Sequence, residues 1–216
     1  MSLLAAVVAK PGSLPAVDRL RQTGNGVVFT WSARRPPRVR FRVPGGPVVG
    51  APAPVCDRCA VEAIRQFSAE QYGRALEPWH WLDLDGKAAL CASPFGDVFL
   101  EDDQGVWWLD TLEGVLTRPW ATREEFAGAL STTEGQDEYL LAGLGLAAEE
   151  AGLGPGPDQV YGFTVPPKLG GALDVDNVEV IDFVVALSLA GQIHRQIRDL
   201  PPGTEITGFT LDDAGS

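Results

Sequence analysis

The chain has 216 residues, of which 45% are hydrophobic and 21% are charged. This composition is typical of a globular protein and excludes wholesale disorder. No apolar run approaches the roughly 18 residues that a membrane-spanning helix needs. The three cysteines are too few for a secreted scaffold held together by disulfides. We therefore expect a cytoplasmic protein without a membrane partner.

The net charge of −12 hides an uneven distribution along the chain. Residues 1–66 carry 10 basic and 3 acidic side chains, a balance of +7, whereas residues 67–216 carry 7 and 26, a balance of −19. Such asymmetry predicts either a basic arm or two segments of different origin. The acidic part argues against nucleic acid as the main partner and favours a basic protein.

The first 60 residues are rich in proline, glycine and arginine, which interrupt regular structure. We expect residues 1–60 to form a mostly irregular, poorly ordered basic extension. Two short runs within it, Val27–Trp31 and Val39–Val43, are strand-like, but an isolated hairpin is marginal in water. A lineage-specific arm and a start codon placed too far upstream would both explain this composition.

A folded acidic domain is expected over residues 61–212, followed by a short tail at 213–216. Ser68 and Gln71 form a capping box that predicts a helix, which Pro78 would end. Strands are predicted next, in two hairpins and one further strand. They are Trp79–Leu84 with Ala88–Ala92 around Asp85-Gly86, Asp97–Glu101 with Val106–Asp110, and Gly114–Thr117.

Helix signals dominate the following region. Thr122 and Glu125 open a predicted helix over Arg123–Leu130, and Thr133 with Gln136 opens another that runs to Ala151 and closes at Gly152. Further predictions are strands at Val160–Val165 and Asn177–Val185 and a last helix with its apolar stripe from Ala186 to Leu200. The fold class is therefore α+β, an antiparallel β-meander covered by helices.

The cysteine and histidine residues give only weak indications of a metal or redox site. Cys56 and Cys59 form a C-x-x-C pair, a weak candidate for a metal or redox site. Cys91 with either His80 or His194 would have to complete a zinc site, but the spacing from Cys59 to His80 and Cys91 matches no standard zinc module. We expect no cofactor.

Carboxylates gather in two groups, Glu101-Asp102-Asp103 and Asp174, Asp176, Glu179. Paired acids serve in glycosidases and bind divalent cations, so a small hydrolase using them or the cysteine pair is an alternative function. The first group is also explained by turn chemistry. The second begins like a calcium loop but has Glu179 at the sixth position, where glycine is required. No residue is assigned a catalytic role.

Two adjacent tryptophans, Trp107 and Trp108, must point to opposite faces of their predicted strand. One can fill the core. The other needs a second covering layer, which we favour, or it lies exposed as an anchor for a partner.

Seven segments in the same order resemble a bacterial domain family once described as of unknown function. They are Trp79–Leu82, Phe95–Phe99, Leu109–Gly114, Gly135–Leu140, Gly156–Phe163, Pro166–Gly171 and Gly191–His194. The family forms the C-terminal domain of type VI secretion immunity proteins, which protect a cell from its own DNase effector, and often follows a GAD-like domain. The resemblance spans about residues 67–207, whereas residues 1–60 do not look like the GAD-like domain.

The resemblance implies a non-catalytic protein that binds a cognate basic toxin. Our hypothesis is that the contact uses the acidic groups with a tryptophan as anchor. These residues are Glu101, Asp102, Asp103, Trp107, Trp108, Asp174, Asp176 and Glu179. A further alternative is an adaptor that binds nucleic acid through the basic arm.

Overall fold

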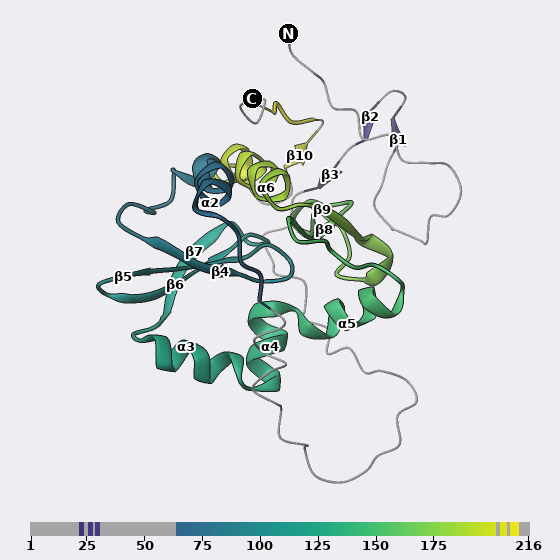
Figure 1. Ribbon diagram of the computed structural model, residues 1–216. Helices are drawn as coiled ribbons and strands as arrows, with labels where there is room; N and C mark the ends of the chain where they lie inside the picture. The colour runs from purple at the N-terminus through teal and green to yellow at the C-terminus, as the bar shows by residue number, and fades with distance from the viewer. Residues whose placement is uncertain are drawn as a thin grey trace.

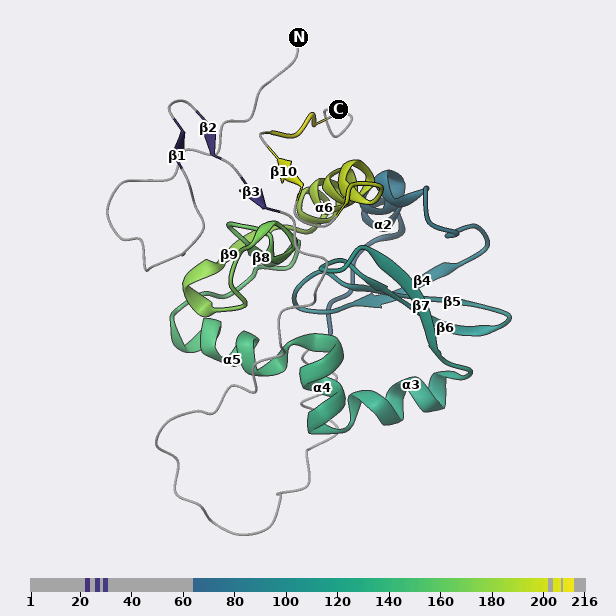
Figure 2. The ribbon, with the colours of Figure 1, turned by 180° about the vertical axis from the view of Figure 1, so that it is seen from behind.

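The computed structural model describes residues 64–201, 204–206 and 208–211, together with the backbone of three two-residue strands near the N-terminus. Figures 1 and 2 show a central sheet with helices on both faces and a smaller hairpin beside it. The predicted α+β class, a helix-covered antiparallel meander, is confirmed.

The central sheet contains four antiparallel strands in sequence order. They are β4 (Ala88–Ala92), β5 (Val98–Asp102), β6 (Gly105–Asp110) and β7 (Val115–Trp120). The β5–β6 hairpin is tight, since Asp102 pairs with Gly105 and the Asp102 carboxylate accepts a hydrogen bond from the Gln104 N–H at 2.9 Å. The predicted hairpin here and the strand after Gly114 are confirmed.

The predicted first hairpin is wrong, because residues 79–84 do not form a strand. Trp79 ends a short 3₁₀ helix, η1 (Glu77–Trp79), and the strand neighbour of β4 is β5, with a single further bridge from Ala92 to Arg65. The Trp79 indole is fully buried, and its Nε1 donates to the Leu187 carbonyl oxygen at 3.0 Å. This contact joins two residues that lie 108 positions apart in the chain, and it outweighs the local preference of Asp85-Gly86 for a hairpin turn.

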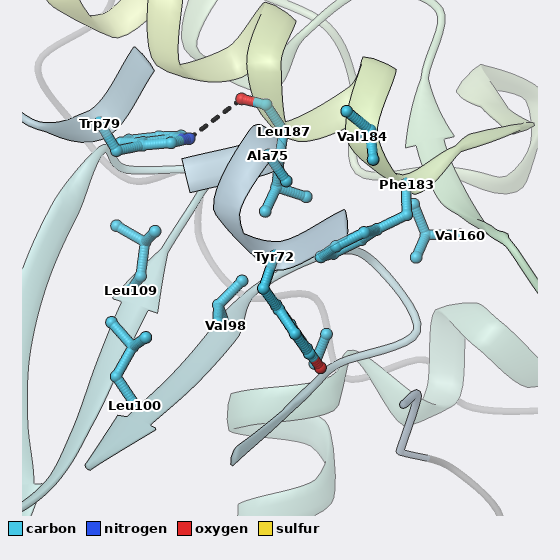
Figure 3. Close-up of a cluster of buried hydrophobic side chains, with 11 residues drawn as sticks. Tyr72, Ala75, Trp79, Val98, Leu100, Leu109, Val160, Phe183, Val184 and Leu187 are labelled. Carbon is cyan, nitrogen blue, oxygen red and sulfur yellow. Dashed lines mark hydrogen bonds between the residues drawn. The ribbon is translucent and has the colours of Figure 1, made fainter. Parts of the chain in front are cut away.

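Two helices, α2 (Ala69–Leu76) and α6 (Phe183–Ile197), cover one face of the sheet (Figures 1 and 2). The predicted capping box at Ser68 and Gln71 opens α2. Figure 3 shows the core beneath these helices, where side chains of both meet those of β5 and β6. Its labelled members are Tyr72, Ala75, Trp79, Val98, Leu100, Leu109, Val160, Phe183, Val184 and Leu187.

The opposite face of the sheet lies over α3 (Arg123–Leu130) and α4 (Thr133–Leu140). A second apolar cluster fills this layer, with Phe99, Trp108, Trp120, Phe126 and Leu140 among its members. Both faces of the meander are therefore buried, which confirms the second covering layer inferred from the paired tryptophans.

The predicted single helix from Thr133 to Ala151 is two helices. Leu141 adopts the left-handed conformation, with φ 52°, and separates α4 from α5 (Ala142–Glu150). The N-cap of α4 is Thr132 rather than Thr133, since the Thr132 hydroxyl accepts from the Gly135 N–H. Gly152, with φ 86°, closes α5 as predicted.

A second hairpin follows, formed by β8 (Gln159–Phe163) and β9 (Val178–Asp182). Two 3₁₀ helices, η2 (Pro167–Leu169) and η3 (Val175–Asn177), lie between its strands. The predicted strand to Val185 is too long, because Asp182 caps α6 by accepting from the Val185 N–H at 3.1 Å.

The remaining described strands are short. β1 (Gln22–Thr23) pairs with β2 (Gly26–Val27), and β3 (Phe29–Thr30) pairs with β10 (Glu205–Ile206). The predicted hairpin partner Val39–Val43 and the order of the extension lie outside the described residues. The domain boundary near residue 60 stays a prediction.

Candidate functional site

The first acidic group, Glu101–Asp103, lies at the end of the β5–β6 hairpin, and Glu101 already has a cationic partner. The Arg123 guanidinium, at the start of α3, donates from Nε to Glu101 Oε1 at 2.7 Å and from Nη2 to Oε2. This pairing holds the pKa of the Glu101 carboxyl below its usual value. One of the three acids in this group is thus paired with a cation of the same chain.

Asp102 belongs to a cluster with Trp107 and Lys87. The indole N–H of Trp107 lowers the pKa of the Asp102 carboxyl, and the Lys87 ammonium lies 3.7 Å from Asp102 Oδ2. Lys87, with a side chain only 4% exposed, also lies 4.4 Å from the centre of the Trp107 ring, a cation–π contact. Trp107 is consequently half-buried and covered, and Asp103 is the exposed acid of this group.

Trp108 lies on the opposite face of β6, where its ring packs edge-on against Tyr139 with centroids 4.9 Å apart. The side chain is buried between the sheet and α4. Trp108 thus fills the core and Trp107 lies half-buried beneath Lys87, in keeping with the covering layer that we favoured. Whether either tryptophan contacts a partner stays a prediction.

The second acidic group lies elsewhere in the molecule. Asp174 caps η3 by accepting from the Asp176 N–H at 3.1 Å, and Glu179 lies in β9. All three side chains are exposed. Figures 1 and 2 place β9 and the β5–β6 hairpin tip at opposite sides of the molecule, so the two predicted groups do not form one patch. Whether either group binds a partner stays a prediction.

A third acidic surface was not singled out from the sequence. Residues 121–152, which form α3, α4 and α5, carry seven acidic side chains and one basic one, Arg123. All seven acids are exposed, and Leu146 of α5 is exposed beside them at 59%. The sequence holds a signal for this surface, because Leu140, Leu144 and Ala147 share one side of the predicted helix while Leu146 lies off it, shortly before Glu149 and Glu150.

A network of polar side chains is buried next to the turn between β6 and β7. The Thr111 N–H and hydroxyl both donate to Asp97 Oδ1, at 2.8 and 2.7 Å. His194 Nε2 lies 2.9 Å from the Thr111 carbonyl oxygen, which can only accept, so this nitrogen carries the proton. Glu113 pairs with Lys168 at 2.7 Å. Four of the seven family-like segments therefore contribute side chains to this buried network.

Burial shifts the acidity of this network. Desolvation, with the nearby Asp110 charge, raises the pKa of Asp97 to about 7. Desolvation lowers the pKa of His194 to about 4, so the imidazole is neutral at physiological pH. Both side chains are at most 6% exposed, which suits a structural role better than contact with a substrate.

The other predicted reactive groups do not assemble into a site. Cys91 is buried against Phe99 and Trp108 on the far face of the sheet from His194, and burial raises the pKa of its thiol to about 12. His80 is exposed, with Nδ1 2.8 Å from the Glu77 carbonyl oxygen. Cys56 and Cys59 lie outside the described residues. Within the described part of the chain, no three histidine, cysteine or acidic side chains are grouped to hold a metal ion.

Within the same described part, no helix combines the length and the apolar character that crossing a membrane requires.

Comparison with known families supports the resemblance drawn from the sequence segments. In particular, residues 121–194 match the family described as T6SS immunity protein Tdi1, C-terminal, where T6SS denotes the type VI secretion system. This match extends from α3 into α6 and covers about a third of the chain. No curated protein matches the chain.

Proposed function

We propose that this protein neutralises a basic, DNA-cleaving toxin by binding it directly, without catalysis. The observation that carries the proposal is the charge of the matched segment. Residues 121–194 contain twelve acidic and two basic side chains, and all twelve acids are exposed. Both cations, Arg123 and Lys168, are engaged by glutamates of this chain, Glu101 and Glu113.

The charge distribution gives the proposal a physical mechanism. A DNase must present cationic side chains to hold the phosphate backbone. An acidic surface of this density would attract the cationic DNA-binding surface of the toxin over several ångströms and accelerate the encounter of the two proteins. Once docked, the acidic surface would occupy the positions that phosphates take. The proposal places this activity in the cytoplasm, where it would protect the cell's DNA.

The full-length chain, tagged and used as bait in lysate of the source bacterium, tests the proposal. We expect a basic polypeptide that is retained at low ionic strength, released by salt and identified by mass spectrometry. After purification, that polypeptide should cleave plasmid DNA, and an equimolar amount of this chain should stop the cleavage. A captured polypeptide that cleaves DNA equally fast in the presence of the chain would contradict the proposal.

A further inference from the structure

The outer face of α5 exposes a large apolar side chain that the core does not use. Leu146 is 59% exposed, more than Val115 at 43% or Val185 at 48%, the other large exposed hydrophobic residues of the described chain. Leu144 and Ala148 of the same helix are buried, so Leu146 points away from the core. Removing Leu146 from water requires a partner.

Acidic side chains border this apolar residue. Glu149 and Glu150 follow Leu146 by three and four positions, which puts them on the same side of α5 one turn further on. Both are exposed, and no ion pair to either is present among the described residues. We call Leu146, Glu149 and Glu150 the α5 face.

The position of these glutamates disfavours the isolated helix. They lie in the last turn of α5, where the free carbonyl groups already carry partial negative charge, and no basic residue offsets them there. The first turn, where acids would stabilise the helix, contains none. The helix end and the two carboxylates together form a region that attracts a cation, which sets the charge of any occupant.

We propose that the α5 face docks a basic segment of the toxin, with an apolar side chain of that segment packed on Leu146 and a lysine or arginine at Glu149 and Glu150. This inference rests on the proposed function and adds the surface and the chemistry of the contact. It differs from the hypothesis based on Glu101 and Trp107, whose side chains are engaged within the chain.

Binding of the purified, nuclease-inactivated toxin to full-length variants tests the α5 face. Leu146→Gln replaces the apolar anchor by a polar residue that also favours helix, and we expect the affinity for the toxin to fall about tenfold. Glu149→Lys/Glu150→Lys should slow association about tenfold at low salt and flatten its salt dependence. Val185→Gln on α6 and Glu70→Lys/Glu77→Lys on α2 and η1 are matched controls, which should change affinity less than about twofold.

The possible outcomes distinguish a failure of the α5 face from a failure of the proposed function. If the toxin binds the wild-type chain and both α5 variants equally well, the α5 face is overturned and the proposed function stands. If the wild-type chain binds no basic polypeptide, both are overturned. If Leu146→Gln abolishes self-association of the chain but leaves toxin affinity unchanged, the α5 face belongs to a second copy and the inference is overturned. Unfolding curves of every variant confirm that the fold is retained.

Discussion

At the scale of single residues, Gly114 shows how closely the buried network is packed. Its φ is +69°, and a Cβ added there would lie 2.3 Å from His194 Nδ1, whose ring is held against Trp79 with centroids 5.6 Å apart. Gly114→Ala should therefore lower the free energy of unfolding by about 3 kcal/mol, through left-handed strain and overpacking together. Gly86→Ala, at φ +75° with open space around it, carries the strain alone and should cost about 1 kcal/mol. Equal losses in urea unfolding would refute the overpacking.

At the scale of secondary-structure elements, α5 depends on a cap supplied by the preceding helix. Its N-cap residue, Leu141, offers no side-chain hydrogen bond, and the Asp137 carboxylate of α4 instead accepts from the Gly143 N–H at 3.1 Å. Asp137→Ala should cost about 1 kcal/mol, whereas Asp137→Asn should retain most of the cap. Urea unfolding measures the cost, and hydrogen exchange should quicken at the first amides of α5 in Asp137→Ala only. Wild-type stability and exchange rates in Asp137→Ala would show that the cap contributes nothing.

Elements marked by local chemistry could be predicted from the sequence, and those fixed by distant contacts could not. The helix starts at Ser68 and Thr122 were found because each capping hydroxyl accepts from an N–H only three residues ahead. The break at Leu141 was missed because a left-handed leucine is tolerated only where tertiary packing holds it, here against the cluster around Leu144. The strand predicted over residues 79–84 failed for the same reason.

The same distinction between local and distant contacts decides which features of the candidate site could be predicted. The excess of acidic residues is visible in the sequence, but which acids stay unmatched depends on pairs such as Arg123 with Glu101, 22 residues apart. From the sequence, Trp107 was a candidate anchor for a partner, whereas the fold places Lys87 over its ring. Conversely, Leu146 lies outside the apolar positions of its helix in the sequence, but only the structure, with Leu146 59% exposed, shows that no other described part of the fold covers it.

At the scale of the whole molecule, two buried groups give opposing dependences of stability on pH. Asp97 has its pKa raised from 3.8 to about 7 in the folded chain, so its contribution to stability is present below pH 4 and is lost as pH rises to 7. His194 has its pKa lowered from 6.5 to about 4, so its contribution is present above pH 6.5 and is lost as pH falls to 4. Between pH 4 and 6.5 the two slopes offset each other.

Removing either group should therefore expose the slope of the other. In Asp97→Asn, which keeps an acceptor for Thr111, the free energy of unfolding should rise with pH between 4 and 6.5, by at most about 1.4 kcal/mol per pH unit. In His194→Gln, whose amide can still donate to the Thr111 carbonyl, it should fall with pH over the same interval. Urea unfolding of the full-length wild type and both variants at half-unit pH steps measures these slopes. Because the predicted slopes have opposite signs, parallel curves for the two variants would show that neither buried group titrates as its surroundings require.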